Sequence, residues 1–204
     1  MKTDPVRSIF LVILVGAGAC SHATEPLAPT PEVPKFTCLA NSATMRLSAE
    51  LRSTLPTFGP QGVNDAYVSI SKSVPGGFAA LFWEDNHFVL TFVEPEKANQ
   101  ARAEIEQALV TRGAVAAGTN LKTAEFRGGA RWTFAELDEW DRYIIPKLSG
   151  VGGISSTSID AVANAIRFGV IDETARAQVE ARLASIGVSC NLVITVIQPY
   201  ATAL

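Results

Sequence analysis

The sequence predicts an α+β fold made of two similar units, each with the order strand, strand, helix, strand, joined by a helix rich in aromatic residues. Paired apolar runs around turn residues indicate β-hairpins, and each pair is followed by a segment whose apolar residues have helical spacing. The order recurs, because residues 76–78 align with 152–154 and Gly113 aligns with Gly187. One such unit is too small to bury both faces of its sheet. We therefore expect the halves to pack through the central helix.

The first half begins with helical segments and continues into a hairpin. Residues 48–55 are helical in character and stop at Pro56, while residues 63–74 fit both a helical face and strand alternation, of which we favour the helix. The remaining predicted elements are a strand at 78–83, a turn at 84–86, a strand at 87–93, one helix from Pro95 to Arg112 capped by Gly113, and a strand at 121–126.

The central helix carries Trp132, Trp140 and Tyr143, whose aromatic side chains we expect in the core, and Pro146 should kink or end it. Its carboxylates at Glu136, Asp138, Glu139 and Asp141 should form a solvated face. The second half is predicted to hold a strand at 154–159, a turn at 160–164, a strand at 165–171, a helix from the cap Asp172 to Ile186, and a strand at 192–197. Each unit is then half of a ferredoxin-like fold.

The first twenty residues have the order of a secretory signal. Lys2 and Arg7 precede an apolar run at residues 9–15, and small residues at 16–19 lead to Cys20. A cysteine at this place resembles a bacterial lipobox, in which the thiol is acylated, with palmitate among the chains, and anchors the protein to the membrane. The alternative is an ordinary signal cut after Ala19 that leaves Cys20 as a free thiol. The apolar run is well short of the ~20 residues that span a bilayer.

These features divide the chain into a lipoprotein signal peptide at residues 1–19, a Pro-, Ala- and Thr-rich tether at 20–36, an N-terminal lobe at 37–129 and a C-terminal lobe at 130–204. Ser21 is not the aspartate associated with inner-membrane retention. We therefore expect an exported protein held on the cell envelope, at the outer membrane if the cell has one.

If Cys20 carries lipid, Cys38 and Cys190 remain as an even pair in an exported protein. A disulfide between them would close nearly the whole folded region and stabilise it by up to about 5 kcal/mol. Two buried free thiols are the alternative, and the oxidising compartment favours the disulfide.

Charge and motifs exclude several functions. Without residues 1–19 the chain holds 15 basic and 19 acidic residues, a net charge of −4, which argues against nucleic acid as a partner. No cluster of His, Cys, Asp and Glu has metal spacing, and no motif indicates a small-molecule cofactor. His87 is expected to be structural, and Ser69 with Lys72 matches S-x-x-K only by chance. We expect no catalytic residues.

Several segments resemble the pro-region of alpha-lytic-type secreted serine proteases. The sequence FAALFWE at 78–84, followed by FVLTF at 88–92, is similar to its first half. The second half is closer, with WDRYIIPK at 140–147 and NAIRFGV at 164–170, which is similar to an N-x-[IV]-x-[IV]-G-V strand. The resemblance covers roughly residues 62–198 and implies the same two-lobe fold.

In that family the pro-region assists folding of the attached protease and then inhibits it. Its last strand adds to a protease hairpin, and the tail that follows lies in the active site. Carried onto this chain, the strand is 191–198, the tail is 199–204, and the partner-binding residues are Leu192, Ile194, Val196, Gln198, Pro199 and Tyr200. The sequence holds no protease, so the action would be in trans.

The sequence therefore predicts a lipid-anchored, non-enzymatic protein that binds a partner by strand addition, with a secreted serine protease or another envelope protein as the partner. A structural envelope lipoprotein without a protease partner is the alternative, favoured if the final strand lies between two neighbours. An enzyme that uses Ser69 and Lys72 is a third hypothesis.

Overall fold

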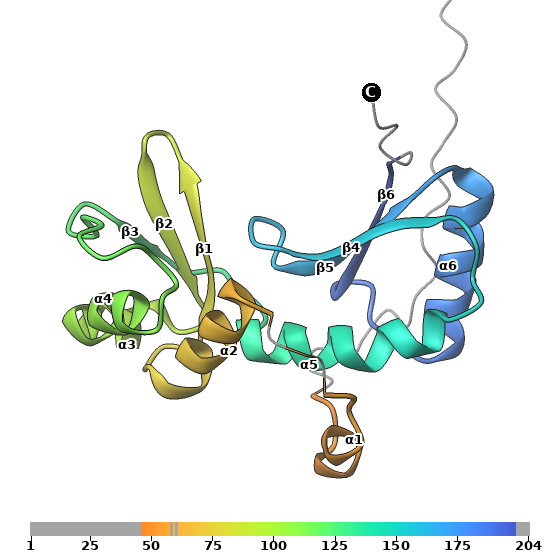
Figure 1. The fold of residues 1–204 in the computed structure, drawn as a ribbon, viewed down its shortest axis with the longest axis horizontal. Helices are drawn as coiled ribbons and strands as arrows, with labels where there is room; N and C mark the ends of the chain where they lie inside the picture. The colour runs from red at the N-terminus through yellow and green to blue at the C-terminus, as the bar shows by residue number, and fades with distance from the viewer. Residues whose placement is uncertain (1–45, 58, 60, 199–204) are drawn as a thin grey trace, which may run out of the picture. The chain divides into compact units, whose positions relative to one another are not determined.

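Two three-stranded sheets, each with one antiparallel and one parallel strand pair, organise the chain in the computed structural model (Figure 1). The structure describes residues 46–57, 59 and 61–198. All of these belong to one compact unit, residues 35–204. The predicted α+β class is confirmed.

The N-terminal sheet has the order β1-β2-β3. Strands β1 (Phe78–Glu84) and β2 (His87–Phe92) form an antiparallel hairpin, and β3 (Glu125–Arg127) lies parallel to β2. Asp85 and Asn86 both have positive φ angles, 43° and 64°, which is the conformation that a two-residue hairpin turn requires. Glu84 therefore belongs to the strand and not, as predicted, to the turn.

Helices α1 (Ala49–Ser53) and α2 (Val63–Ser73) lie where predicted. The prediction of a single helix at 95–112 is wrong in one respect, because the structure has two helices there, α3 (Pro95–Gln100) and α4 (Arg102–Thr111). The division falls at Ala101, where ψ is 17° and the N–H group lies within hydrogen-bonding reach of the carbonyls of both Lys97 and Ala98. This tightened turn leaves Ile105 and Leu109 of α4 buried against the sheet.

The strand predicted at 121–126 is present only as Glu125–Arg127. Leu121 and Ala124 lie in a turn closed by a 2.9 Å hydrogen bond from the Ala124 N–H to the Leu121 carbonyl. Both side chains are buried in the N-terminal core, so their apolar character serves packing and not strand pairing.

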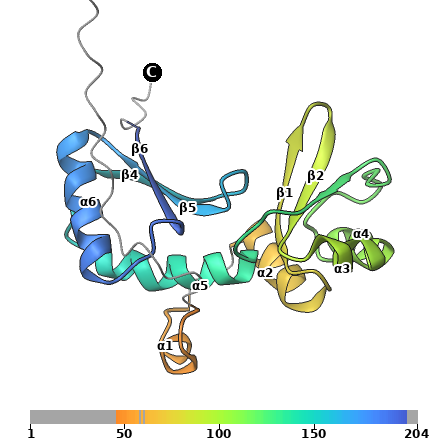
Figure 2. The same cartoon turned by 180° about the vertical axis from the view of Figure 1, so that it is seen from behind.

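The C-terminal sheet has the order β4-β5-β6. Strands β4 (Ile154–Asp160) and β5 (Ala165–Val170) are antiparallel, and β6 (Val193–Ile197) is parallel to β5. Helix α6 (Glu173–Ser185) connects β5 to β6 and lies beside the sheet (Figure 2). The predicted cap is confirmed, because the Asp172 carboxylate accepts a hydrogen bond from the Ala175 N–H.

The two sheets repeat one another in detail. In both, the hairpin register shifts at its first pairs, between Phe78 and Ala80 in β1 and between Ile154 and Ser156 in β4. In both, the helix before the last strand is followed by a glycine with a positive φ angle, Gly113 at 72° and Gly187 at 74°. The predicted alignment of the two halves agrees with these positions.

Helix α5 (Phe134–Ile144) contributes to two hydrophobic cores. Phe134 packs in the N-terminal core with the two strands β1 and β2, whereas Leu137, Trp140 and Ile144 pack in the C-terminal core. The helix begins with a capping box between Thr133 and Glu136, and Pro146 lies in the 3₁₀ helix (Ile145–Leu148) that ends it.

The solvated carboxylate face predicted for this helix is wrong for three residues. Glu136 closes the capping box. Asp138 is buried and forms an ion pair with Arg142 at 2.8 Å. Asp141 is half-buried and accepts a hydrogen bond from the Thr157 hydroxyl of β4. Glu136 and Asp138 are therefore bonded within the helix and its cap, and Asp141 ties α5 to β4.

Candidate partner-binding edge

Strand β6 lies at the edge of the C-terminal sheet, and within the described ranges it pairs only with β5. Its sequence is VITVI, so every residue is β-branched, a side-chain type that favours strands. The strand was predicted at 192–197 and begins one residue later, at Val193.

Along β6, the backbone N–H and C=O groups of successive residues point alternately toward β5 and away from it. The Ile166 N–H donates to the Leu192 carbonyl at 2.8 Å, and the Gln198 N–H donates to the Val170 carbonyl at 2.7 Å. In a parallel pair the residues that bond to the neighbour alternate with residues that do not. The backbone groups of the even-numbered residues 192–198 therefore face β5, and those of Val193, Thr195 and Ile197 face outward.

The side chains of these odd-numbered residues lie on the sheet face covered by α6. The Thr195 hydroxyl donates a 2.6 Å hydrogen bond to the Glu180 carboxylate of that helix, which holds β6 against it. Val193 belongs to the C-terminal core, and Ile197 is 42% exposed. Helix α6 therefore holds β6 from one face of the sheet, and the outward backbone groups of Val193, Thr195 and Ile197 lie along the edge of this fixed strand.

The even-numbered residues place their side chains on the other face. Ile194 lies beside Arg167 of β5, and Val196 lies beside Gly169. A Cβ atom on Gly169 would come within 2.3 Å of the Ser156 hydroxyl and 3.0 Å of the Gln198 amide oxygen. Because glycine has no side chain, the Ser156 hydroxyl reaches across β5 and donates to that oxygen at 3.3 Å.

The structure brings together only part of the predicted binding set. The side chains of Ile194 and Val196 are half-buried, and that of Gln198 is exposed. Leu192 is fully buried in the C-terminal core, so its side chain is not accessible to a partner. Pro199 and Tyr200 lie outside the described residues. The outward backbone of residues 193, 195 and 197 was missed, because alternation in a sequence does not say which backbone groups face the neighbouring strand.

Cys190 lies in the turn before β6 and is disulfide-bonded. The other two cysteines of the sequence, Cys20 and Cys38, are outside the described residues, as are the signal and the tether. The pairing of Cys190 with Cys38 and the lipidation of Cys20 stay predictions.

Ser69 and Lys72, the residues that match S-x-x-K, both lie in helix α2. The Ser69 hydroxyl receives a hydrogen bond from the Arg112 guanidinium, and the described part of the chain shows no bond between Ser69 and Lys72. No group of three or more His, Cys, Asp or Glu residues within the described ranges could hold a metal ion. None of the described helices is long and apolar enough to span a bilayer.

His87 belongs to a charged network on the N-terminal sheet. Its ring lies 3.2 Å from both the Asp85 carbonyl and the Glu125 carboxylate, and these two groups, the carbonyl first, raise the pKa of His87. Hydrogen bonds from Arg127 and then from His87 lower the pKa of Glu125 to about 2. The network therefore favours the protonated form of the His87 imidazole.

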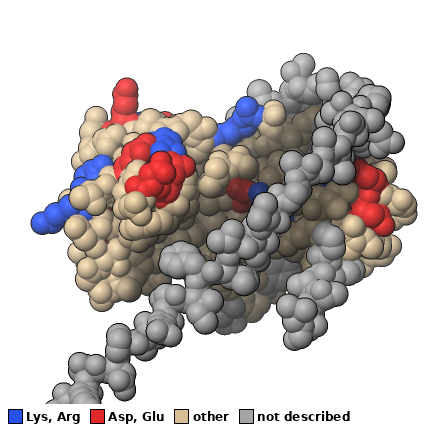
Figure 3. Space-filling model, turned by 90° about the horizontal axis from the view of Figure 1, so that it is seen from above, with Lys and Arg blue, Asp and Glu red and all other residues tan. Residues whose placement is uncertain are grey.

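Comparison of the chain with protein-family models and with curated proteins finds no match. On the face drawn in Figure 3, the described Lys, Arg, Asp and Glu residues stand in small groups, with no extended surface of one sign.

Proposed function

We propose that this chain is an exported, lipid-anchored and non-enzymatic protein that binds a partner protein by strand addition to β6, with a secreted serine protease as the partner that it inhibits or helps to fold. The proposal combines the edge position of β6 with the resemblance to protease pro-regions, whose two ββαβ halves agree with the element order of both sheets.

The observation that carries the proposal is that β6 lacks the features that protect sheet edges. Natural edge strands are blunted by charged residues, proline, bulges or short length. Among the other edges, β1 and β4 each have a register shift and an acidic end, and β3 has only three residues, two of them charged. Strand β6 has five apolar or hydroxyl residues, no charge and no shift. This distinction favours partner binding at β6 over the structural-lipoprotein alternative.

The test uses the full-length protein and a chymotrypsin-like secreted protease from the same cells. Ile197→Pro removes one outward N–H and retains the inward hydrogen bond from the Gln198 N–H. We expect it to weaken inhibition at least about tenfold, since a lost hydrogen bond and a misfitting ring together exceed ~1.4 kcal/mol. The matched control Ile197→Ala keeps the N–H and should inhibit nearly as the parent does.

Deletion of residues 199–204 examines the second half of the proposal. If the tail lies in the protease active site, the deletion abolishes inhibition while circular dichroism of the truncated protein is unchanged. Full inhibition by both the proline variant and the truncated protein would refute strand addition. A parent protein that cross-links only to envelope proteins would favour the structural alternative.

The anchoring is tested separately. Cys20→Ser should move the protein from the membrane fraction to the soluble exported fraction and abolish palmitate labelling. Membrane association that persists in this variant would contradict acylation at Cys20.

A further inference from the structure

The turn before β6 is tied to a part of the chain outside the described residues. Cys190 is disulfide-bonded, and the other two cysteines of the sequence are Cys20 and Cys38. The backbone of Ser189, the residue before Cys190, makes a β-bridge for which none of the described strands is the partner. A disulfide holds its two Cα atoms within ~4.4–6.8 Å of each other, so the segment that carries the partner cysteine passes the start of β6.

Residues 35–37, with the sequence Lys-Phe-Thr, directly precede the predicted partner Cys38 and belong to the same compact unit as β6. Pro34 has no N–H to donate, so strand pairing along this segment begins after it. With Cys38 at the start of β6, the residues before it that follow the strand run antiparallel to it. Residues 39–45 lead instead to Arg46, which forms an ion pair with the first turn of α5.

Glu180 of α6 places a negative charge beside the outward edge of β6. Its carboxylate accepts the hydrogen bond from the Thr195 hydroxyl, and no described cation forms an ion pair with it. Arg176, one helical turn earlier, is bonded to Glu173 instead. A lysine opposite Thr195 on an added strand would lie on the same face of the sheet as Glu180.

We propose that residues 35–37 form a short antiparallel strand on the edge of β6. Lys35 lies opposite Thr195, and Thr37 lies opposite Val193. The outward N–H and C=O groups of both β6 residues then exchange hydrogen bonds with the residues opposite them. The occupant of this part of the edge is therefore the chain itself.

The side chains of the segment match both faces of the sheet in this register. The Lys35 ammonium reaches the Glu180 carboxylate, while Phe36 points to the other face and packs beside the half-buried Ile194. A shift of one residue would turn Lys35 away from Glu180 and bring the phenylalanine to the charged side. Charge and apolar contact therefore select the same register.

The segment covers only the first part of the edge. It pairs with Val193 and Thr195 and leaves the outward groups of Ile197 for the partner strand, which would displace the segment from that end. This consequence rests on the proposed function, whereas the pairing of residues 35–37 does not.

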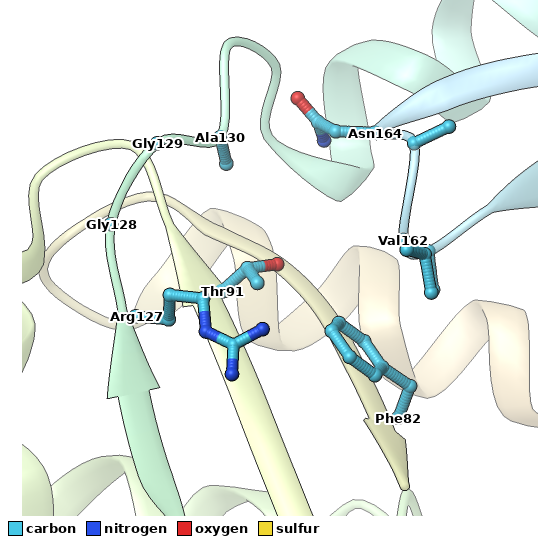
Figure 4. Close-up of a pocket in the computed structure, with 10 residues that line it drawn as sticks. Phe82, Thr91, Arg127, Gly128, Gly129, Ala130, Val162 and Asn164 are labelled. Atoms are coloured by element: carbon cyan, nitrogen blue, oxygen red, sulfur yellow. The ribbon is translucent and has the colours of Figure 1, made fainter. Parts of the chain in front are cut away.

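The cavity of about 170 Å³ in Figure 4 is a poorer place for this segment. It is lined by Thr91 and Arg127 of the N-terminal sheet and by residues 161–164 of the β4–β5 turn. Arg127 is the charged residue of the lining, and a second cation beside it would be repelled. Its carboxylate partners are already engaged, because Glu84 and Glu125 both bind Arg127 and His87 is bonded to the same Glu125.

Hydrogen exchange of the ¹⁵N-labelled full-length protein in detergent, measured by NMR, tests the pairing. The variant Lys35→Pro removes the N–H that faces Thr195, so we expect the Val193 and Thr195 amides to exchange at least tenfold faster than in the parent. The control Thr30→Pro introduces the same ring earlier in the chain and should leave both rates unchanged.

Unprotected Val193 and Thr195 amides in the parent, or equal protection in Lys35→Pro, would overturn the proposal. Protection that rises with protein concentration and persists in Lys35→Pro would place a second copy of the chain on the edge, and would overturn it as well.

Charge reversal tests the register. Lys35→Glu and Glu180→Lys should each speed exchange of the Thr195 amide at least fivefold, and the double variant, which restores opposite charges, should regain most of the protection. The control Lys122→Glu makes the same change at an exposed lysine and should have no effect on this amide. A double variant no better protected than the single ones would refute the contact between Lys35 and Glu180.

Inhibition assays separate this inference from the proposed function. If a partner strand must displace the segment, Lys35→Pro should inhibit the protease at least threefold more tightly than the parent. Protected Val193 and Thr195 amides without inhibition by any variant would refute the proposed function and support the pairing. Inhibition by a parent protein whose amides are unprotected would refute the pairing and leave the proposed function intact.

Discussion

Replacing Asp141 by asparagine should stabilise the protein near neutral pH. Asp141 lies on α5, and its carboxylate accepts a 3.3 Å hydrogen bond from Thr157 of β4. Burial, with a smaller contribution from nearby Asp138, raises the pKa of Asp141 from 3.8 to about 6 against the opposing effects of Thr157 and Arg142. The folded state therefore binds this proton more tightly than the unfolded state does.

The sign and size of this effect on the free energy of unfolding follow from the linkage between proton binding and folding. Between pH 3.8 and about 6 the folded state holds more protons on Asp141, so the contribution of this group to stability falls as the pH rises through that window. Above pH 6 the full cost of the buried charge is present. A difference of roughly two pH units corresponds to about 3 kcal/mol as an upper figure, at 1.36 kcal/mol per unit.

Asparagine retains an oxygen that can accept from Thr157 and has no charge to bury. We expect Asp141→Asn to raise the free energy of unfolding by up to about 3 kcal/mol at pH 7.5 and by up to about 1 kcal/mol at pH 4.5. Urea unfolding of both proteins at the two pH values measures this, provided that the m value is unchanged.

The exposed residue Glu104 of α4 provides a charge-matched control. Glu104→Gln should change stability by less than about 0.5 kcal/mol at either pH. A gain in Asp141→Asn that is equal at pH 4.5 and pH 7.5, or a loss at pH 7.5, would show that burial does not penalise this carboxylate and would refute the reasoning.

Two further predictions concern other parts of the fold. Gly153→Ala should destabilise the protein by at least about 2 kcal/mol in urea unfolding, because the φ angle of Gly153 is +78° and an added Cβ would clash with the Ala175 Cβ. The control Gly152→Ala should have much less effect, because no atom lies within 4 Å of an added Cβ there. Similar losses of stability in the two variants would contradict the prediction. The pKa of His87, measured by NMR, should lie above 6.5 and should return toward 6.5 in Glu125→Gln. Because the folded state raises this pKa, the contribution of His87 to stability is present at low pH and is lost as the pH rises through the pKa. A pKa at or below 6.5 in the parent protein would contradict the network.

Much of the secondary structure follows from local patterns. The Asp85-Asn86 turn, the Asp172 cap and the glycines at 113 and 187 act over a few residues, so the sequence alone indicates them. The division at Ala101 could not be predicted, because alanine is a strong helix former and the kink serves the packing of α4.

The sites depend on contacts between distant segments. Asp141 has the spacing of a solvated helix face, and only the position of β4, where Thr157 donates to its carboxylate, removes it from water. The direction of each backbone group in β6 follows from its register with β5, and the cavity joins Thr91 to a turn about 70 residues later in the chain. No local pattern contains that information.

The place of α5 in both cores has a consequence for how the protein unfolds. Opening either core removes burial from the same helix, through Phe134 on one side or Trp140 on the other. The two lobes should therefore lose structure in one cooperative step, and the amide hydrogens of α5 should exchange with solvent only through global unfolding. A partner that stabilises β6 would then slow exchange in the N-terminal sheet as well, although it touches only the other lobe.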